Sequence, residues 1–257
     1  MNVFPRIEII GVTGLPEINK GDNLSEMIVG AAQRQGTPLV NGDILVVTQK
    51  VVSKAEGRLV DLKDVTPSPF ARQLAEDSGK DARLVELVLR ESRSIVRMDL
   101  DRGIMITETK HGFVCANAGI DSSNVPGDDV VCLLPVDPDK SAQGIRKAIA
   151  GLTGGAQIGV VISDTFGRAW REGHSNFAIG VDGVEPMKDY RGTLDANGRM
   201  LKVTTIAVAD ELAAAAEMVT AKAINVPVAI VRGYEHGTDS PNGIKPMIRD
   251  RSRDLFR

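Results

Sequence analysis

Short apolar runs rich in β-branched residues recur along the chain, and they limit the possible folds more than any other feature. Such runs predict strands when turn residues bound them, because branched side chains favour an extended backbone. The clearest runs are RIEIIGV (6–12), DILVVTQ (43–49), GIMITETK (103–110), GFVCANA (112–118), DVVCLLPV (129–136), IGVVISD (158–164), TTIAVA (204–209) and VPVAIVRG (226–233). We therefore expect a sheet with a largely aliphatic core.

Helical patterns lie between some of these runs but not between all of them. Each places apolar residues at a helical spacing, most with a capping residue at the start or a Gly at the end. They are GDNLSEMIVGAAQRQG (21–36), PSPFARQLAEDSG (67–79), DARLVELVLRES (81–92), DPDKSAQGIRKAIAGLTGG (137–155) and ADELAAAAEMVTAKAI (209–224). Only KHG separates the runs within 103–118, which favours an antiparallel pair. The mixture predicts an α+β fold with a mixed or antiparallel sheet and packed helices.

The chain shows no internal repeat and no low-complexity linker. Its length fits one unit over residues 1–257, with two subdomains as the alternative and no visible boundary between them. The stretch 182–199 is rich in Gly, Asp and Arg, which predicts a long functional loop or an excursion between subdomains. Residues 234–257 are polar and rich in Gly and Pro, and we expect a loosely packed surface tail there.

Charge and composition exclude several classes of function. The chain has 31 Lys and Arg residues against 34 Asp and Glu residues, which is not the footprint of a general nucleic-acid-binding protein. Cys115 and Cys132 lie in apolar segments and are expected to be buried free thiols. No signal peptide is visible, and no apolar run reaches the ~18 residues of a membrane span. We expect a cytoplasmic protein that binds neither nucleic acid nor membrane.

Common nucleotide-binding and hydrolytic motifs are missing from the sequence. There is no GxxxxGKS/T phosphate loop, no GxGxxG after a strand and no GxSxG elbow. The three histidines have no partner at the spacing of a nucleophile and its base. A nucleotide would have to be bound by another design.

Two strand ends carry carboxylates that could hold a metal ion. Asp164 and Thr165 end the run IGVVIS, and Asp121 follows CANAGI with Ser122, Ser123 and Asn124 behind it. Carboxylate and hydroxyl oxygens are the ligands that hard divalent cations prefer, and a strand end holds them rigidly. The alternatives are that Asp164 caps a turn and that Asp121 belongs to an ordinary Asx-rich turn.

Two further stretches could contact phosphates. Lys50 and Lys54 in VVTQKVVSKAEGR would share one face of a helical turn, although two solvated lysines are the common alternative. In GVTGLPEI, Gly11 and Gly14 flank a turn after the first strand, and such a turn can bind a nucleotide base or phosphate. Each of these signals is weak when taken alone.

Taken together, these stretches resemble the coenzyme F420:L-glutamate ligase family. In order along the chain, the matching segments are GVTGLPEI, VVTQKVVSKAEGRLV, ETKHGFVCANAGIDSSNV, SDTFGRAWREG, IGVDGV, DYRG, VADELAAAAE, PVAIVRG and the terminal DLFR. The pair HGFVCANAGIDSSN and SDTFGRAWREG at this separation is the most specific. The resemblance covers essentially the whole chain and is closest to the stand-alone ligase form, which lacks the flavin-binding domain of some bacterial relatives.

The resemblance implies an activity, cofactors and partners. The family uses GTP to join L-glutamate to a precursor of the deazaflavin coenzyme F420, by way of an acyl phosphate. It requires a divalent metal, Mg²⁺ or Mn²⁺, with two ions expected and a monovalent cation such as K⁺ as a further expectation. Its members form an intertwined α+β homodimer, so a homodimer is expected here.

The resemblance also implies roles for single residues. Asp121 and Asp164 would be metal ligands, Thr165 would help to hold a second ion, and Asn124 would contact the nucleotide. The remaining residues of the GTP site would be Leu15, Pro16, Glu17, Ile18, Gln49 and Lys54. From chemistry rather than from the resemblance, we add Arg168 and Arg171 as catalytic candidates, because guanidinium groups bind phosphate oxygens well.

Two departures from the family pattern affect these expectations. Lys222 stands where members often have a carboxylate ligand for the second metal, and His174, Ser175 and Asn176 replace a run similar to Gln-Thr-Asp. The alternatives are a ligase of the same fold with another carboxylate acceptor or amino acid, and a non-catalytic nucleotide-binding protein. The ligase hypothesis predicts that Asp121 and Asp164 converge, whereas the non-catalytic alternative predicts that they lie apart or face solvent.

Overall fold

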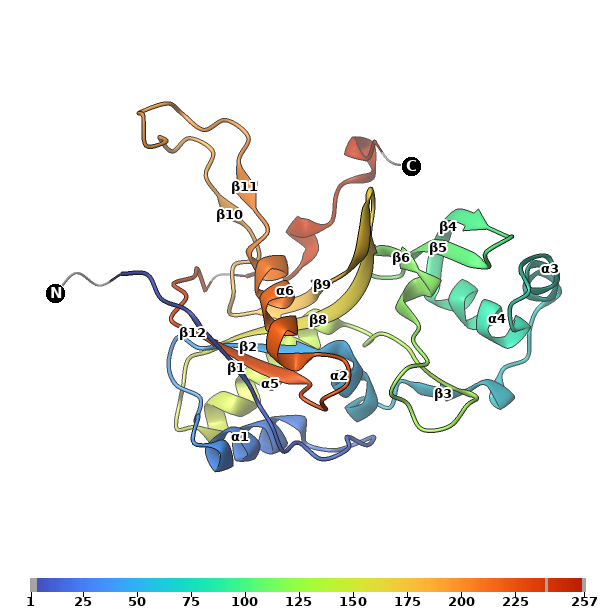
Figure 1. The fold of residues 1–257 in the computed structure, drawn as a ribbon, viewed down its shortest axis with the longest axis horizontal. Coiled ribbons are helices and arrows are strands. Elements are labelled where there is room, and N and C mark those ends of the chain that lie inside the picture. Colours follow the sequence, from blue (N-terminus) through green and yellow to red (C-terminus); the bar gives the residue numbers. More distant parts are fainter. Residues whose placement is uncertain (1–3, 239, 256–257) are drawn as a thin grey trace.

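A computed structural model describes residues 4–238 and 240–255, and a mixed sheet forms its centre (Figure 1). The strand order is β1-β12-β2-β8-β9. These strands are β1 (Glu8–Gly11), β12 (Val228–Arg232), β2 (Ile44–Thr48), β8 (Gly159–Arg168) and β9 (Arg171–Asp182). β2 and β8 are parallel, whereas the other neighbouring pairs are antiparallel. The predicted α+β class with a mixed sheet is confirmed.

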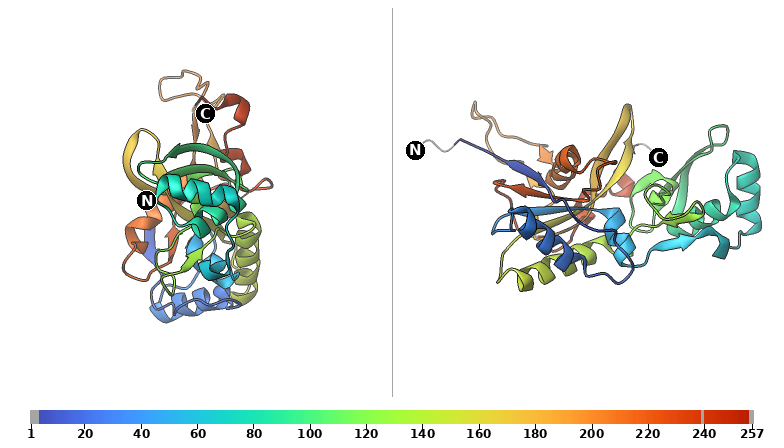
Figure 2. Two further views of the ribbon diagram at one scale, coloured as in Figure 1. Left: turned by 90° about the vertical axis from the view of Figure 1, so that its right-hand side faces the viewer. Right: turned by 60° about the horizontal axis from the view of Figure 1, so that its bottom comes forward.

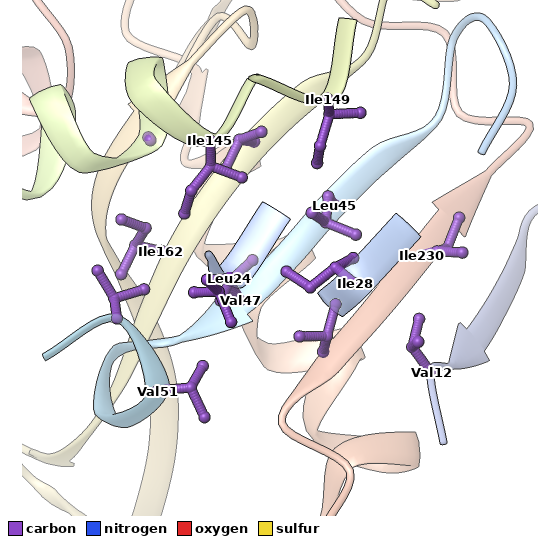
Figure 3. Close-up of a cluster of buried hydrophobic side chains, with 14 of the residues drawn as sticks. Val12, Leu24, Ile28, Leu45, Val47, Val51, Ile145, Ile149, Ile162 and Ile230 are labelled. Atoms are coloured by element: carbon purple, nitrogen blue, oxygen red, sulfur yellow. The ribbon is translucent and has the colours of Figure 1, made fainter. Parts of the chain in front are cut away.

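Helices cover both faces of this sheet, which explains why most of β12, all but the end of β2 and the first half of β8 are apolar. α1 (Leu24–Gln35) and α5 (Pro138–Leu152) lie on one face, and α6 (Val208–Thr220) lies on the other (Figure 1, Figure 2). Successive side chains of a strand point to opposite faces, so Leu45 joins the core beside α1 and α5 while Val46 joins the core beside α6. Figure 3 shows the first of these cores.

Local capping signals set the limits of the helices. α1 begins after Asn23, whose side chain accepts a hydrogen bond from the backbone N–H of Glu26. It ends at Gly36, which adopts the left-handed backbone (φ 81°) that a residue with a β-carbon rarely enters. α5 begins after Asp137, whose side chain accepts from the backbone N–H of Lys140. The sequence contained all of these signals, and both helices are confirmed.

A smaller lobe lies beside the sheet (Figure 2). It has an apolar cluster of its own, which includes Val85, Val88 and Met105. Its sheet has the order β4-β5-β6. The predicted antiparallel pairing across the KHG turn is confirmed. The elements of the lobe are α3 (Pro69–Ser78), α4 (Ala82–Glu91), β4 (Ser92–Asp99), β5 (Ile104–Thr109) and β6 (Val114–Ala116).

Short elements connect the smaller lobe to the central sheet. α2 (Gln49–Ala55) follows β2 directly, and β3 (Leu59–Asp61) pairs with β7 (Val130–Cys132) in an antiparallel ribbon. The 3-10 helices are η1 (Leu62–Asp64), η2 (Asn117–Gly119), η3 (Lys245–Met247) and η4 (Arg251–Arg253).

Strand β8 does not end at Asp164, where the apolar run ends. It continues to Arg168 and turns into β9, a strand that the sequence analysis did not predict. Asp164 therefore lies inside a strand opposite Phe177, so the alternative that it caps a turn is wrong. The first half of β9, REGHSN, is polar because this end of the hairpin is largely exposed, and this hid its extended structure.

The predicted strand at 204–209 is mostly wrong. Only β11 (Thr205–Ile206) is extended, and α6 begins at Val208. β11 pairs with β10 (Lys188–Asp189) at the base of a long excursion that extends away from the sheet (Figure 1). The loop predicted at 182–199 thus forms most of this excursion.

The C-terminal segment is better packed than its composition suggests. Ile244 is 4% exposed and belongs to the core beside α6, and its backbone N–H donates to the Asp139 carboxylate. The expectation of a loosely packed tail is therefore wrong at this point. Residues 239, 256 and 257 of the predicted tail lie outside the described residues.

Cys115 and Cys132 are buried and free, as predicted. The single unit over residues 1–257, with two subdomains as its alternative, stays a prediction. Within residues 4–238 and 240–255, no helix combines the length and the apolar character needed to cross a membrane.

Candidate active site

A cavity of about 730 Å³ opens at the carboxyl end of β2, beside residues 163–165 in the middle of β8. The two strands are parallel, with Thr48 paired to Ser163, so the cavity lies at the edge of the sheet where β2 ends and β8 continues to Arg168. Ligand sites of sheets that contain parallel strands commonly lie at such an edge. The walls come from residues within 15–20, 48–59, 121–126, 163–165 and 176, and within 217–227. The segments that line the cavity are therefore far apart in the sequence, from residue 15 to residue 227.

The residues predicted to hold nucleotide and metal all line this cavity. They are Leu15, Pro16, Glu17, Ile18, Gln49, Lys54, Asn124, Asp121, Asp164 and Thr165. The structure therefore brings Asp121 and Asp164 together, as the ligase hypothesis requires. The roles assigned to these side chains remain predictions.

Asp164 is held in an environment that disfavours its charge. Burial raises the pKa of its carboxyl to about 7, although a hydrogen bond from the backbone N–H of Thr165 opposes this shift. The nearby charge of Asp121 raises the pKa further, whereas Lys50 and Lys222 lower it. A bound cation would favour the charged carboxylate here.

Asp121 has the opposite pKa shift because it has a charged partner. Burial acts to raise its pKa, but hydrogen bonds from Lys50 and Ser123 outweigh this effect and leave the pKa below its ordinary value. Lys50 Nζ lies 2.7 Å from Asp121 Oδ2 and 2.9 Å from Ser123 Oγ. Lys50 was one of the two candidate phosphate contacts in the sequence. In this structure its ammonium group neutralises Asp121.

The predicted nucleotide residues are themselves in contact. Lys54 on α2 is buried and forms an ion pair with Glu17 of the turn after β1. Gln49 is also buried, and its amide nitrogen donates to Ser53 Oγ at 2.8 Å and to the backbone oxygen of Leu133 at 3.1 Å. α2 thus anchors one wall of the cavity to the N-terminal turn and to the segment after β7.

Asn124 also lines the cavity, in a left-handed backbone conformation (φ 53°). Its amide nitrogen lies 3.4 Å from the backbone oxygen of Lys222, which follows α6. The loop that carries Asp121 therefore closes against the end of α6. Lys222 also lines the cavity.

The sequence analysis did not identify Asn176 and Glu217 as members of this site, although both line the cavity. Thr165 Oγ1 lies 2.7 Å from Asn176 Oδ1, and Asn176 Nδ2 lies 2.8 Å from Glu217 Oε2. Asn176 was noted only as a departure from the family pattern. Asn176 ends a polar run in β9, and the sequence analysis did not predict this strand. Its pairing with Thr165 could therefore not be predicted.

Arg168 and Arg171 lie at the tip of the β8–β9 hairpin, and neither is among the residues that line the cavity. Arg168 donates to the backbone oxygens of Glu172 and Gly173, and so braces the turn. Trp170 in this turn is 86% exposed. The predicted action of the two arginines on a substrate phosphate stays a prediction.

The oxygen ligands of the cavity fit a divalent cation that is also held by phosphate oxygens. Two carboxylates and a hydroxyl, from Asp121, Asp164 and Thr165, are the hard ligands that Mg²⁺ and Mn²⁺ prefer. In the described part of the chain, no group of three or more His, Cys, Asp or Glu side chains could hold a metal ion. Mg²⁺ commonly binds through one or two carboxylates plus substrate phosphates, so this cavity fits an ion that binds together with a nucleotide.

Comparison with known proteins places the chain in a family. The model of the family F420-0:gamma-glutamyl ligase matches residues 13–233, a range that contains every segment lining the cavity. The chain is 47% identical to the coenzyme F420:L-glutamate ligase of Methanothermobacter thermautotrophicus, over 98% of this chain and 99% of that protein. It is 44% identical to the enzyme of that name from Methanopyrus kandleri over 100% of both chains, and 42% identical to that from Methanocaldococcus jannaschii over 98% and 97%. The chain belongs to the F420-0:gamma-glutamyl ligase family.

Proposed function

We propose that this protein is a GTP- and divalent-metal-dependent ligase that joins L-glutamate to a precursor of coenzyme F420 through an amide bond. The observation that carries the proposal is the convergence of two carboxylates, a hydroxyl and a lysine-bearing helix in one cavity of a chain from this family. The names of the similar enzymes supply glutamate and coenzyme F420. The nucleotide, the metal and the acyl phosphate are what the resemblance in sequence implies, and they are part of the proposal.

The proposed reaction has two group transfers. An oxygen of the acceptor carboxylate attacks the γ-phosphorus of GTP, the bond to the β–γ bridging oxygen breaks, and GDP leaves. The amine of glutamate then attacks the carbonyl carbon of the acyl phosphate, inorganic phosphate leaves, and the nitrogen loses a proton. The products are the amide, GDP and phosphate. Activation is needed because an oxygen anion of a carboxylate is a poor leaving group.

The cavity residues have defined tasks in this proposal. Asp121 and Asp164 would hold a divalent cation, and Thr165 would contribute its hydroxyl oxygen to a second one. When bound, the cations neutralise charge on the transferring phosphoryl group. Lys54 and the turn at 15–18 would contact the nucleotide, together with Gln49.

The remaining charges of the cavity fit the same scheme. A protonated Lys222 cannot coordinate a metal, so it would contribute positive charge to a phosphate. Asn124 would contact the nucleotide, and Arg168 and Arg171 would meet the acceptor at the hairpin tip. A monovalent cation such as K⁺ and a homodimeric assembly complete the proposal.

The test is a turnover assay read by mass spectrometry. Purified protein is mixed with the precursor that lacks glutamate, L-glutamate, Mn²⁺ or Mg²⁺, and either GTP or ATP. The expected result is a mass gain of one or more glutamyl units, with one phosphate released per unit, in the presence of GTP and metal. Omission of the metal or substitution of ATP is the matched control and should stop the reaction.

Two other results would change the assignment. Hydrolysis or binding of nucleotide without modification of the precursor would leave the nucleotide site intact and contradict the acceptor, which is the alternative of a ligase with another carboxylate substrate. Failure to bind any nucleotide with Mg²⁺ or Mn²⁺ would contradict the proposed function itself.

A further inference from the structure

Asn176 is a polar side chain buried between three elements of the cavity wall. It lies on β9 and is 4% exposed. Its carbonyl oxygen is 2.7 Å from the hydroxyl of Thr165 on β8, and its amide nitrogen is 2.8 Å from a carboxylate oxygen of Glu217 on α6. Burying an amide is unfavourable unless its polar atoms are paired, and these two contacts pair both ends of this one.

The chemistry of Glu217 decides which way this amide points. A carboxylate only accepts hydrogen bonds, so it must face the NH₂ group of Asn176. The carbonyl of Asn176 then faces Thr165, and because a carbonyl also only accepts, the Thr165 hydroxyl must donate its proton to it. The direction of both hydrogen bonds follows from the identity of Glu217.

This direction leaves Thr165 Oγ1 as an acceptor toward the cavity. A hydroxyl has one proton and two lone pairs, and without a fixed acceptor it rotates to suit its surroundings. Once its proton is committed to Asn176, its lone pairs are available to a cation. A freely rotating hydroxyl would instead donate to a carboxylate or a phosphate.

We propose that Asn176 is a positioning residue, which Glu217 orients and which directs the lone pairs of Thr165 toward a divalent cation. Asn176 acts through Thr165 and touches neither the cation nor the substrate. The proposal rests on the metal site of the proposed function. It adds a residue, Asn176, that fixes the direction in which the hydroxyl of Thr165 points. Partners of metal ligands that lie outside the coordination shell typically change metal affinity by about 10- to 100-fold when they are removed.

The test is a double-mutant cycle on Mn²⁺ binding. Mn²⁺ is titrated into the full-length protein with a non-hydrolysable GTP analogue, and free Mn²⁺ is measured by electron paramagnetic resonance. Asn176→Leu removes both hydrogen bonds while keeping the branching of the side chain, and it should weaken Mn²⁺ binding by about 10-fold. In a Thr165→Val background, where the hydroxyl is already gone, the same change should weaken binding by less than about 2-fold, since coupled residues are not additive.

Two further variants separate positioning from loss of structure. Glu217→Gln keeps a hydrogen-bonding partner but no longer dictates the direction of the amide, so it should give a smaller loss of Mn²⁺ affinity than Asn176→Leu. Thr109→Val is the matched control, since it also replaces a buried, hydrogen-bonded polar side chain with an apolar one, in β5 of the smaller lobe, where Thr109 accepts from the backbone N–H of Phe113 at 3.1 Å. It should leave Mn²⁺ affinity unchanged.

Three results would overturn the inference. The first is an Asn176→Leu protein that binds Mn²⁺ as the wild type does, and the second is an equal loss in the Thr165→Val background. Either would contradict the positioning role and leave the proposed function intact, provided that the wild type binds Mn²⁺. The third is a wild-type protein that binds no Mn²⁺ with the nucleotide analogue, which would overturn the metal site and the inference together.

Discussion

Asp121 and Asp164 line the same cavity, but their pKa values are shifted in opposite directions. Hydrogen bonds from Lys50 and Ser123 hold the pKa of Asp121 below its ordinary value, whereas burial raises the pKa of Asp164 to about 7. Groups with strongly perturbed pKa values in a cavity are candidates for function, because structure has placed them where their charge is unfavourable. Asp164 is therefore the most informative position to change.

Asp164→Asn should remove most ligase activity and leave the fold intact. We expect kcat/KM to fall by about 100-fold or more, because a neutral amide provides much less stabilisation of a cation than a carboxylate does. The same change should not lower the melting temperature of the metal-free protein at pH 8, where burial disfavours the charged carboxylate.

Steady-state kinetics and calorimetry of the purified variant, with wild type in parallel, check both expectations for Asp164. Turnover at the wild-type rate would remove Asp164 from the metal site. A large drop in melting temperature at pH 8 would instead indicate a structural role.

At the scale of single elements, one side chain can stabilise two helices at once. α4 is an example, because Glu86 within it also caps the start of the neighbouring helix α3. Its carboxylate accepts from the Ser68 backbone N–H at 2.9 Å and from Arg90 at 2.8 Å. These hydrogen bonds, with Ser68 first, lower the pKa of Glu86 to about 2.

Glu86 should stabilise the smaller lobe only where it is charged. A carboxyl whose pKa is lowered by folding contributes stability above its unfolded pKa, near 4.5, and loses this contribution as the pH falls toward about 2. Glu86→Gln should therefore lower the urea midpoint at pH 6 by more than at pH 3. Comparing variant and wild type at each pH cancels the titration of other carboxylates. An equal difference at both pH values would contradict the assignment.

Gly180 on β9 allows the sheet to approach α5 closely. A β-carbon at this position would lie 2.5 Å from the backbone of Pro138, which rigid neighbours cannot accommodate. Gly180→Ala should therefore destabilise the protein by about 1–3 kcal/mol, measured by urea unfolding.

Gly144→Ala is the matched control for Gly180→Ala. Gly144 lies within α5 and has open space around its missing β-carbon, so this change should stabilise by about 0.5–1 kcal/mol. A Gly180→Ala protein as stable as wild type would show that β9 and α5 can separate at no cost.

The elements that the sequence predicted are those with complete local signals. α1 has a capping Asn23 and a terminal Gly36, and β2 is an unbroken apolar run. β9 was missed because its exposed half is polar, and its register on β8 decides that Asn176 meets Thr165. The convergence of Asp121 and Asp164 was predictable, whereas the contact with Glu217 depends on how α6 packs against β9.

At the scale of the whole molecule, the excursion carrying β10 and β11 extends from the body (Figure 1). It exposes apolar side chains. Leu194, Met200 and Val203 are 65%, 61% and 85% exposed. Exposed apolar groups that lie together commonly mark an interaction site. This feature is compatible with the homodimer implied by the family resemblance, which stays a prediction.

The homodimer can be tested by size-exclusion chromatography with light scattering. We expect a mass of twice the 27.5 kDa chain at micromolar concentration. Replacing Leu194, Met200 and Val203 by Ser should shift the mass toward one chain if the excursion forms the interface. A wild-type mass of 27.5 kDa would contradict the dimer, and a dimeric triple variant would place its interface elsewhere.

The strand order of the central sheet has a consequence for how the chain is made. In this sheet β1 pairs only with β12, which lies between β1 and β2. During synthesis the first strand to leave the ribosome must therefore wait for the last before it can take its place. The turn at 15–18, directly after β1, forms one wall of the cavity, and residues 225–227 before β12 form another. The pocket is thus completed only after nearly the whole chain has been translated, so a truncated chain that ends before β12 would lack it.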